Sequence, residues 1–153
     1  MKTLLDRLLA KAKQVPSAQG VAEWFALLPN RILSLFVLFL AINFVIIGMR
    51  WLVAPTDSAT QLGLTLDHGV GLSSQVGDMA AFFLTLGICI LTALVTGRRS
   101  FYYPAILLLY IAAIGRIIAW LLHDAALALN FIVPEIIMAT ILLIASRRLS
   151  DED

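Results

Sequence analysis

The sequence predicts an all-α protein, a four-transmembrane-helix bundle with an N-terminal amphipathic interfacial helix. Hydrophobic residues make up 61% of the 153 residues and charged residues only 14%, and the mean hydropathy is +0.95. Soluble domains are roughly half apolar, with about a quarter of their residues charged. Four apolar runs approach the roughly 20 residues that a helix needs to cross a bilayer. The runs are too long for the short alternating strands of a barrel, so helices are the expected spanning structure.

The expected transmembrane domain covers residues 32–148 and contains four spans, at about 32–53, 74–96, 102–122 and 127–145. An acidic tail, 149–153, follows it. Residues 1–31 are predicted to form an amphipathic interfacial segment, because leucines at three- and four-residue spacing mark one helical face and basic residues mark the other. A flexible tail is the alternative for this segment.

The distribution of basic residues predicts an orientation. Lys and Arg precede the first span, join the second to the third and follow the fourth, whereas the two other loops contain neither. By the positive-inside rule, both termini are expected in the cytoplasm.

Composition also excludes some functions. A formal charge of only +1, with dispersed Lys and Arg, gives no support to a nucleic-acid partner. The single cysteine, Cys89, excludes an internal disulfide. We find no glycine-rich phosphate motif and no Ser-His-Asp set, and we expect no cofactor.

The first outer loop, about 20 residues from Ala54, contains Pro55 and three glycines. It is predicted to lack regular structure. A loop of this length commonly covers a site or serves as a mobile connector, and both interpretations remain open.

Each span contains one charged residue in its outer half, and these residues are Arg50, Asp78, Arg116 and Glu135. A lone charge at the centre of a span costs about 2.5–3.5 kcal/mol even on insertion scales, which favours pairing. The planar guanidinium of Arg116 suits two carboxylates. We therefore expect Arg116 to meet both Asp78 and Glu135, with these three residues as the catalytic candidates if the protein is an enzyme.

Other polar residues share these helix faces. In span two, a stripe of mostly polar residues includes Gln75 and Asp78 and predicts a cavity wall; its other members are Ser74, Phe82, Thr85 and Cys89. Gly77 and Gly115, each directly before a charged residue, would allow helices to approach closely. The predicted ligand-binding set is Asn43, Arg50, Gln75, Asp78, Arg116, Trp120, His123 and Glu135. In the alternative interpretation, the charges only lock the helices together.

The outer loops also contain residue types that bind metal ions. Asp67-His68 and His123-Asp124 both lie in predicted outer loops, and two imidazoles with two carboxylates could hold zinc. Their spacing matches no known ligand signature, so we predict solvated loops and no metal.

Four stretches resemble a family of small four-helix bacterial membrane proteins catalogued as a domain of unknown function. They are "APTDSATQLGL", "GDMAAFFLTLGICIL", "GRIIAWLLHD" and "PEIIMATILL". The resemblance implies the fold, a bacterial inner membrane location and a buried triad of Asp78, Arg116 and Glu135, but no reaction. Span two of such proteins commonly has a glutamate followed by an arginine, where this chain has Asp78 and Met79.

Three functions fit these observations. The first is binding, with possible transformation, of an amphiphilic or lipid-like molecule whose head group Arg116 would hold while its tail occupies the bundle. The second is an accessory or assembly subunit of a larger membrane complex or a homo-oligomer, in which the charges are structural. The third is a proton-coupled carrier, which the absence of an inward polar path disfavours.

Overall fold

The computed structural model describes residues 20, 23 and 28–150, and all of its regular elements are helices. This confirms the predicted all-α class. The predicted N-terminal interfacial helix and residues 151–153 of the acidic tail lie outside the described residues. The elements are α3 (Asn30–Val53), α4 (Pro55–Gln61), α5 (Val70–Thr96), the short 3₁₀ helix η1 (Arg99–Phe101), α6 (Tyr102–Leu122) and α7 (Leu129–Arg148).

Within the described part of the chain, four helices are long and apolar enough to cross a membrane: α3, α5, α6 extended by η1, and α7. Glycines with positive φ mark both ends of α5. Gly97 ends α5 in a left-handed conformation, with φ of 67°, which only glycine adopts freely. Gly69, with φ of 57°, directly precedes α5.

Two helix boundaries differ by two to four residues from the approximate spans that the sequence predicts. The second span begins at Val70 rather than residue 74, and α7 covers Leu129–Arg148 rather than 127–145. The polar residues at these ends suggested loop, but a helix continues through polar residues wherever their backbone bonds can still form.

The first connecting loop is not structureless as predicted, because it contains α4. Pro55 stands at the first position of this helix, where a missing N–H removes no hydrogen bond. Ser58 donates a hydrogen bond to the Ala54 carbonyl at 3.0 Å, and Thr60 donates one to the Thr56 carbonyl at 2.9 Å. Ser58 and Ala59 are buried against the bundle, which holds this short helix in place.

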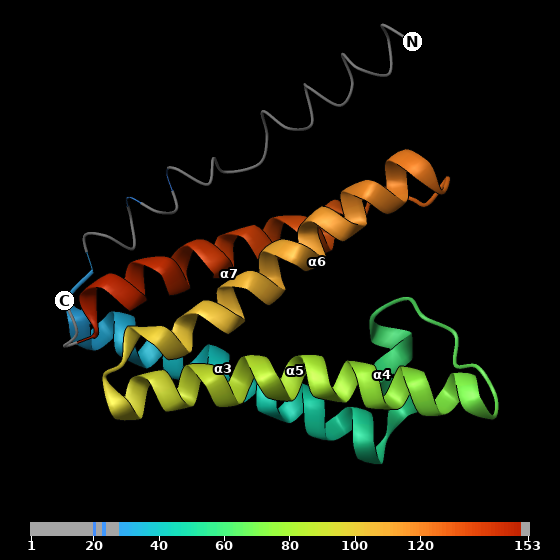
Figure 1. Ribbon diagram of the computed structural model, residues 1–153, viewed down its shortest axis with the longest axis horizontal. Coiled ribbons are helices and arrows are strands. Elements are labelled where there is room, and N and C mark those ends of the chain that lie inside the picture. The colour runs from blue at the N-terminus through green and yellow to red at the C-terminus, as the bar shows by residue number, and fades with distance from the viewer. Residues whose placement is uncertain (1–19, 21–22, 24–27, 151–153) are drawn as a thin grey trace, which may run out of the picture.

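The four long helices form two hairpins (Figure 1). α3 packs most extensively against α5, and α6 packs most extensively against α7. The hairpins lie together where α5 ends and α6 begins, and they diverge toward the end that carries α4. We name these the arginine end, after Arg98, Arg99, Arg147 and Arg148, and the α4 end.

Glycines set the close approach of α3 and α5. A Cβ on Gly87 would lie 2.5 Å from Val45 Cγ2 and 2.8 Å from the Ala41 carbonyl oxygen. A Cβ on Gly48 would lie 2.7 Å from Leu84 Cγ. The close approach expected at Gly77 and Gly115 is wrong, because a Cβ on either would have nothing outside its own helix within 4 Å.

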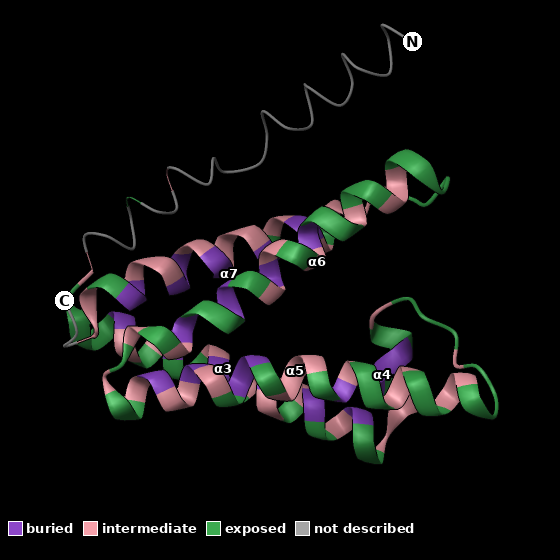
Figure 2. Ribbon diagram, viewed as in Figure 1, coloured by how far each residue is buried: buried purple, intermediate pink, exposed green. Residues whose placement is uncertain are grey.

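The buried residues form a larger cluster where the hairpins lie together and a smaller one at the α4 end (Figure 2). The main apolar core includes fully buried Leu33, Leu86 and Leu142 and joins all four long helices. A second, smaller cluster of Trp51, Ala59 and Ala80 lies at the α4 end, under α4.

Candidate ligand-binding cavity

A cavity of about 400 Å³ lies between the two hairpins, on the α4 side of the main core. Such a volume falls at the lower end of the about 300–1,000 Å³ typical of small-molecule sites. Most of its wall is apolar, formed by Phe39, Leu40, Phe44, Ile47, Leu62, Phe82, Phe83, Leu109, Phe131, Pro134 and Met138. Its remaining lining residues are Asn43, Arg50, Trp51, Ser58, Gln61, Arg116 and Glu135.

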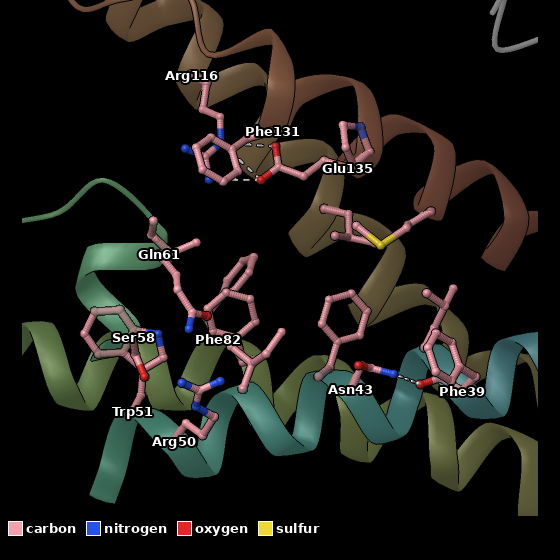
Figure 3. Close-up of a pocket in the computed structure, with 18 residues that line it drawn as sticks. Phe39, Asn43, Arg50, Trp51, Ser58, Gln61, Phe82, Arg116, Phe131 and Glu135 are labelled. Atoms are coloured by element: carbon pink, nitrogen blue, oxygen red, sulfur yellow. Dashed lines mark hydrogen bonds and ion pairs between the residues drawn. The ribbon is translucent and has the colours of Figure 1, made fainter. Parts of the chain in front are cut away.

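Arg116 and Glu135 form an ion pair on the α6–α7 side of the cavity (Figure 3). Arg116 Nη2 lies 3.1 Å from Glu135 Oε1, and Arg116 Nε donates to Oε1 and Oε2 at 3.1 and 3.3 Å. The guanidinium carbon also lies 4.8 Å from the centre of the Phe131 ring, a cation–π contact. The Glu135 side chain is 10% exposed and that of Arg116 is 37% exposed, so the pair borders the cavity rather than lying sealed in the core.

Helical periodicity explains why these two charges face inward. The buried residues of α6 include Leu109 and Ala113, and Arg116 continues this stripe three residues later. In α7, Glu135 itself belongs to the buried face, between Ile132 and Ala139. The predicted contact between Arg116 and Glu135 is therefore present.

Arg50 and Trp51 lie on the opposite wall, near the end of α3. Among the described residues, the Arg50 guanidinium has no hydrogen-bond or ion-pair partner, in contrast to that of Arg116. Trp51 is fully buried, and its indole nitrogen has no hydrogen-bond partner. An indole N–H can only donate, so Arg50 and Trp51 both present donors that have no acceptor among the described residues.

Helix α4 completes this part of the wall with Ser58, Gln61 and Leu62, the last at its C-terminal cap. Figure 3 shows the Gln61 amide and the Arg50 guanidinium pointing toward each other from α4 and α3. The Ser58 hydroxyl already donates to the Ala54 carbonyl.

Asn43 also lines the cavity, as predicted, and it lies deeper along α3. Its side-chain nitrogen donates to the Phe39 carbonyl of its own helix at 2.8 Å. The amide oxygen and the second N–H of this side chain remain for a ligand.

Asp78 does not join the cluster. It is exposed and does not line the cavity, and the carboxylate that pairs with Arg116 is that of Glu135. The buried face of α5 includes Ala80, and two residues correspond to about 200° around a helix. Asp78 therefore faces away from the bundle, as do Ser74 and Thr85. Of the stripe predicted as a cavity wall, only Phe82 lines the cavity.

Three other predicted site residues also lie outside the cavity wall. Gln75 holds the preceding loop, since it accepts a hydrogen bond from the Asp67 backbone at 2.9 Å and donates one to the Thr65 carbonyl at 3.1 Å. Trp120 is half-buried, and His123 is exposed at the end of α6. Both lie where α6 diverges from α3 and α5.

The alternative zinc site does not form. No three His, Cys, Asp or Glu side chains gather closely enough to hold a metal ion in the described part of the chain, which includes Asp67, His68, His123 and Asp124.

Sequence reasoning missed Ser58, Gln61 and the role of Trp51 in the wall. A signal was present for α4, because a proline followed by Thr-Asp-Ser is a common helix start. Comparisons of the chain with protein-family models, curated proteins and solved structures gave no match. The resemblance to the four-helix family therefore stays a prediction.

Proposed function

We propose that this protein binds an amphiphilic or lipid-like small molecule in the cavity between its two hairpins. One observation carries the proposal: an apolar cavity of about 400 Å³ has a few polar groups concentrated on facing walls. Small-molecule sites commonly combine apolar walls with a few convergent polar groups. The modest volume favours a molecule with a single hydrocarbon chain.

The proposed setting is a bacterial inner membrane, with both termini in the cytoplasm. The described arginines Arg98, Arg99, Arg147 and Arg148 lie at one end of the bundle, which supports this end as the cytoplasmic one. The α4 end would then face outward. The ligand would enter from the outer leaflet, where the hairpins diverge.

The geometry supports binding better than catalysis. Catalysis by two carboxylates, one as the acid or base and the other ionised, would require both Asp78 and Glu135 to contact the ligand. Of these two residues, only Glu135 lines the cavity. Glu135 is itself held by Arg116 at 3.1 Å. We therefore propose a binding protein and assign no catalytic residue.

A cavity-filling variant tests this proposal. Ile47 lines the cavity, whereas the adjacent Ile46 is exposed on the outside of α3. The full chain, purified in mild detergent, is analysed by native mass spectrometry and lipid extraction as wild type, Ile47→Trp and Ile46→Trp. We expect one defined molecule to accompany the wild type and Ile46→Trp, and to be lost from Ile47→Trp.

Met138→Trp is a second cavity-filling variant, with the added side chain on α7. It tests the proposal even if Ile47→Trp does not fold. Thermal unfolding shows whether each variant is folded. If no small molecule accompanies the wild type, or if folded cavity-filled variants retain it, the binding proposal fails.

A second candidate is an accessory subunit of a larger membrane complex. The observation that favours it is the outward-facing polar stripe of α5, with Asp78 between Ser74 and Thr85. Polar side chains on the surface of membrane helices commonly bond to a neighbouring helix. If the protein is such a subunit, the same native mass spectra should show a second protein that accompanies the wild type and is lost from Asp78→Leu.

A further inference from the structure

The two arginines of the cavity wall differ in a way that locates the ligand's head group. Arg116 is neutralised by Glu135 and covered by the Phe131 ring. Arg50 has neither kind of contact among the described residues. Of the two arginines, Arg50 is therefore the one whose guanidinium remains available to an anionic ligand group.

Trp51 provides an independent observation at the same wall. Its side chain is fully buried, it lines the cavity, and its indole N–H has no acceptor. Buried donors in folded proteins nearly always have a partner. Figure 3 shows the indole nitrogen on the side of the ring near the Arg50 guanidinium and the Gln61 amide. A ligand oxygen at this point would satisfy the indole and the guanidinium together.

The charge of this wall selects the ligand's chemistry. Among the described residues, Glu135 is the only carboxylate that lines the cavity, and it is engaged by Arg116 on the opposite wall. Arg50, Trp51 and Gln61 together present one positive charge and several N–H donors. A carboxylate or phosphate group complements them, whereas an amine or a quaternary ammonium does not.

The positions of Arg50 and Arg116 along their helices agree with a head group at Arg50. Arg50 lies 20 residues beyond Asn30, the start of α3, which at a rise of about 1.5 Å per residue is about 30 Å, the thickness of a bilayer's hydrocarbon core. Arg116 lies 14 residues beyond Tyr102, or about 21 Å by the same rise. Counted from the opposite ends, Arg50 lies three residues before Val53 and Arg116 lies six residues before Leu122. Arg50 is thus the closer of the two to the end of its helix, where a head group would lie.

We infer that Arg50, Trp51 and Gln61 form the head-group site of the cavity, and that it takes the carboxylate or phosphate of a single-chain amphiphile. The hydrocarbon chain extends past the Arg116–Glu135 pair toward Phe39, Leu40 and Met138. This inference rests on the proposed binding function and replaces the sequence-based expectation that Arg116 holds the head group.

The test compares probes that share one chain and differ in the head. Dissociation constants of oleate, oleyl phosphate and the uncharged methyl oleate are measured by native mass spectrometry on the full chain. We expect the wild type to bind the two anions about 10- to 100-fold more tightly than methyl oleate, the range that charge-assisted hydrogen bonds provide. The stronger of the two anions identifies the head group as carboxylate or phosphate.

Single substitutions then show which residues cause the preference for the anionic probes over methyl oleate. Arg50→Gln should remove it while leaving methyl oleate binding intact, which also shows that the variant is folded, and Arg50→Lys should restore most of it. Trp51→Phe should weaken both anions and not methyl oleate. The exposed Arg147, at the arginine end, gives the matched control, and Arg147→Gln should change none of these constants.

Other outcomes separate this inference from the binding function. If Ile47→Trp abolishes binding of all three probes but the wild type does not prefer the anions, the cavity binds amphiphiles and the head-group assignment is wrong. The assignment is also wrong if the preference survives in Arg50→Gln and disappears in the Arg116→Gln, Glu135→Gln double variant. If Ile47→Trp and Ile46→Trp bind the probes equally, the proposed function itself fails.

Discussion

At the residue scale, the charges within the spans divide into three environments. Arg116 and Glu135 pair across α6 and α7, Arg50 faces the cavity without a protein partner among the described residues, and Asp78 faces outward. Asp78 lies 18 residues before Thr96, the end of α5, which corresponds to about 27 Å. A carboxylate so close to the edge of a hydrocarbon core of about 30 Å can reach the polar interface, so it needs no buried partner.

The Arg116–Glu135 pair should contribute a measurable coupling energy. Glu135→Gln removes the charge that balances Arg116, and we expect it to lower the free energy of unfolding by about 1–2 kcal/mol. This is less than the about 3–5 kcal/mol of a fully buried pair, because Arg116 is 37% exposed. Unfolding in mixed micelles of Glu135→Gln, Arg116→Gln and the double variant gives the coupling through a double-mutant cycle.

Arg147→Gln is the control for the loss of an arginine, because Arg147 is exposed and far along α7 from the pair. If the effects of the two single substitutions simply add in the double variant, the pair contributes no coupling and this prediction is contradicted.

At the scale of helices, small residues decide which face of α5 meets α3. The buried face of α5 includes Ala80, Gly87 and Ala93, and Gly87 meets the backbone of α3 at Ala41. In a membrane, close backbone approach replaces much of the hydrophobic drive that joins helices in water. This preference for small residues turns Asp78 away from the bundle, even though Asp78 lies at a depth where a partner was expected.

Gly87→Ala should therefore destabilise the bundle. The added Cβ would meet the Ala41 carbonyl oxygen at 2.8 Å, and a backbone atom cannot move aside by changing rotamer. We expect a loss of about 1–3 kcal/mol, typical of overpacking, measured as a lower midpoint of thermal or detergent-induced unfolding.

Gly77→Ala on the same helix is the matched control. Nothing outside its own helix lies within 4 Å of the position of a Cβ there, so this substitution should leave stability unchanged or raise it by up to about 1 kcal/mol through the lower entropy of the unfolded chain. Equal effects of the two substitutions would show that the α3–α5 contact is not as close as described.

At the scale of the whole molecule, two hairpins that meet at the arginine end and diverge at the α4 end leave a cavity between them. Apolar residues seal its inner end, while α4 covers part of the other. This asymmetry fits a site entered from one side of a membrane. It does not favour a carrier, which would need alternate openings to both sides.

The proposed orientation can be measured with single cysteines. In a Cys89→Ala background, Thr65→Cys places a thiol in the loop at the α4 end, and Ser100→Cys places one at the arginine end; both positions are exposed. In bacterial cells, a membrane-impermeant maleimide should label the first without permeabilisation and the second only after it. The reverse pattern would overturn the orientation and place the head-group site on the cytoplasmic side.

The sequence alone determined the helical class and the four apolar helices, because length and composition are local properties of the chain. It also paired Arg116 correctly with Glu135, because charges of opposite sign in the same part of the bundle favour pairing. It did not determine which face of each helix meets a neighbour. Tertiary packing decided that Asp78 faces outward and that α4 brings Gln61 to Arg50, because rotation of a helix about its axis depends on the surfaces that close against it.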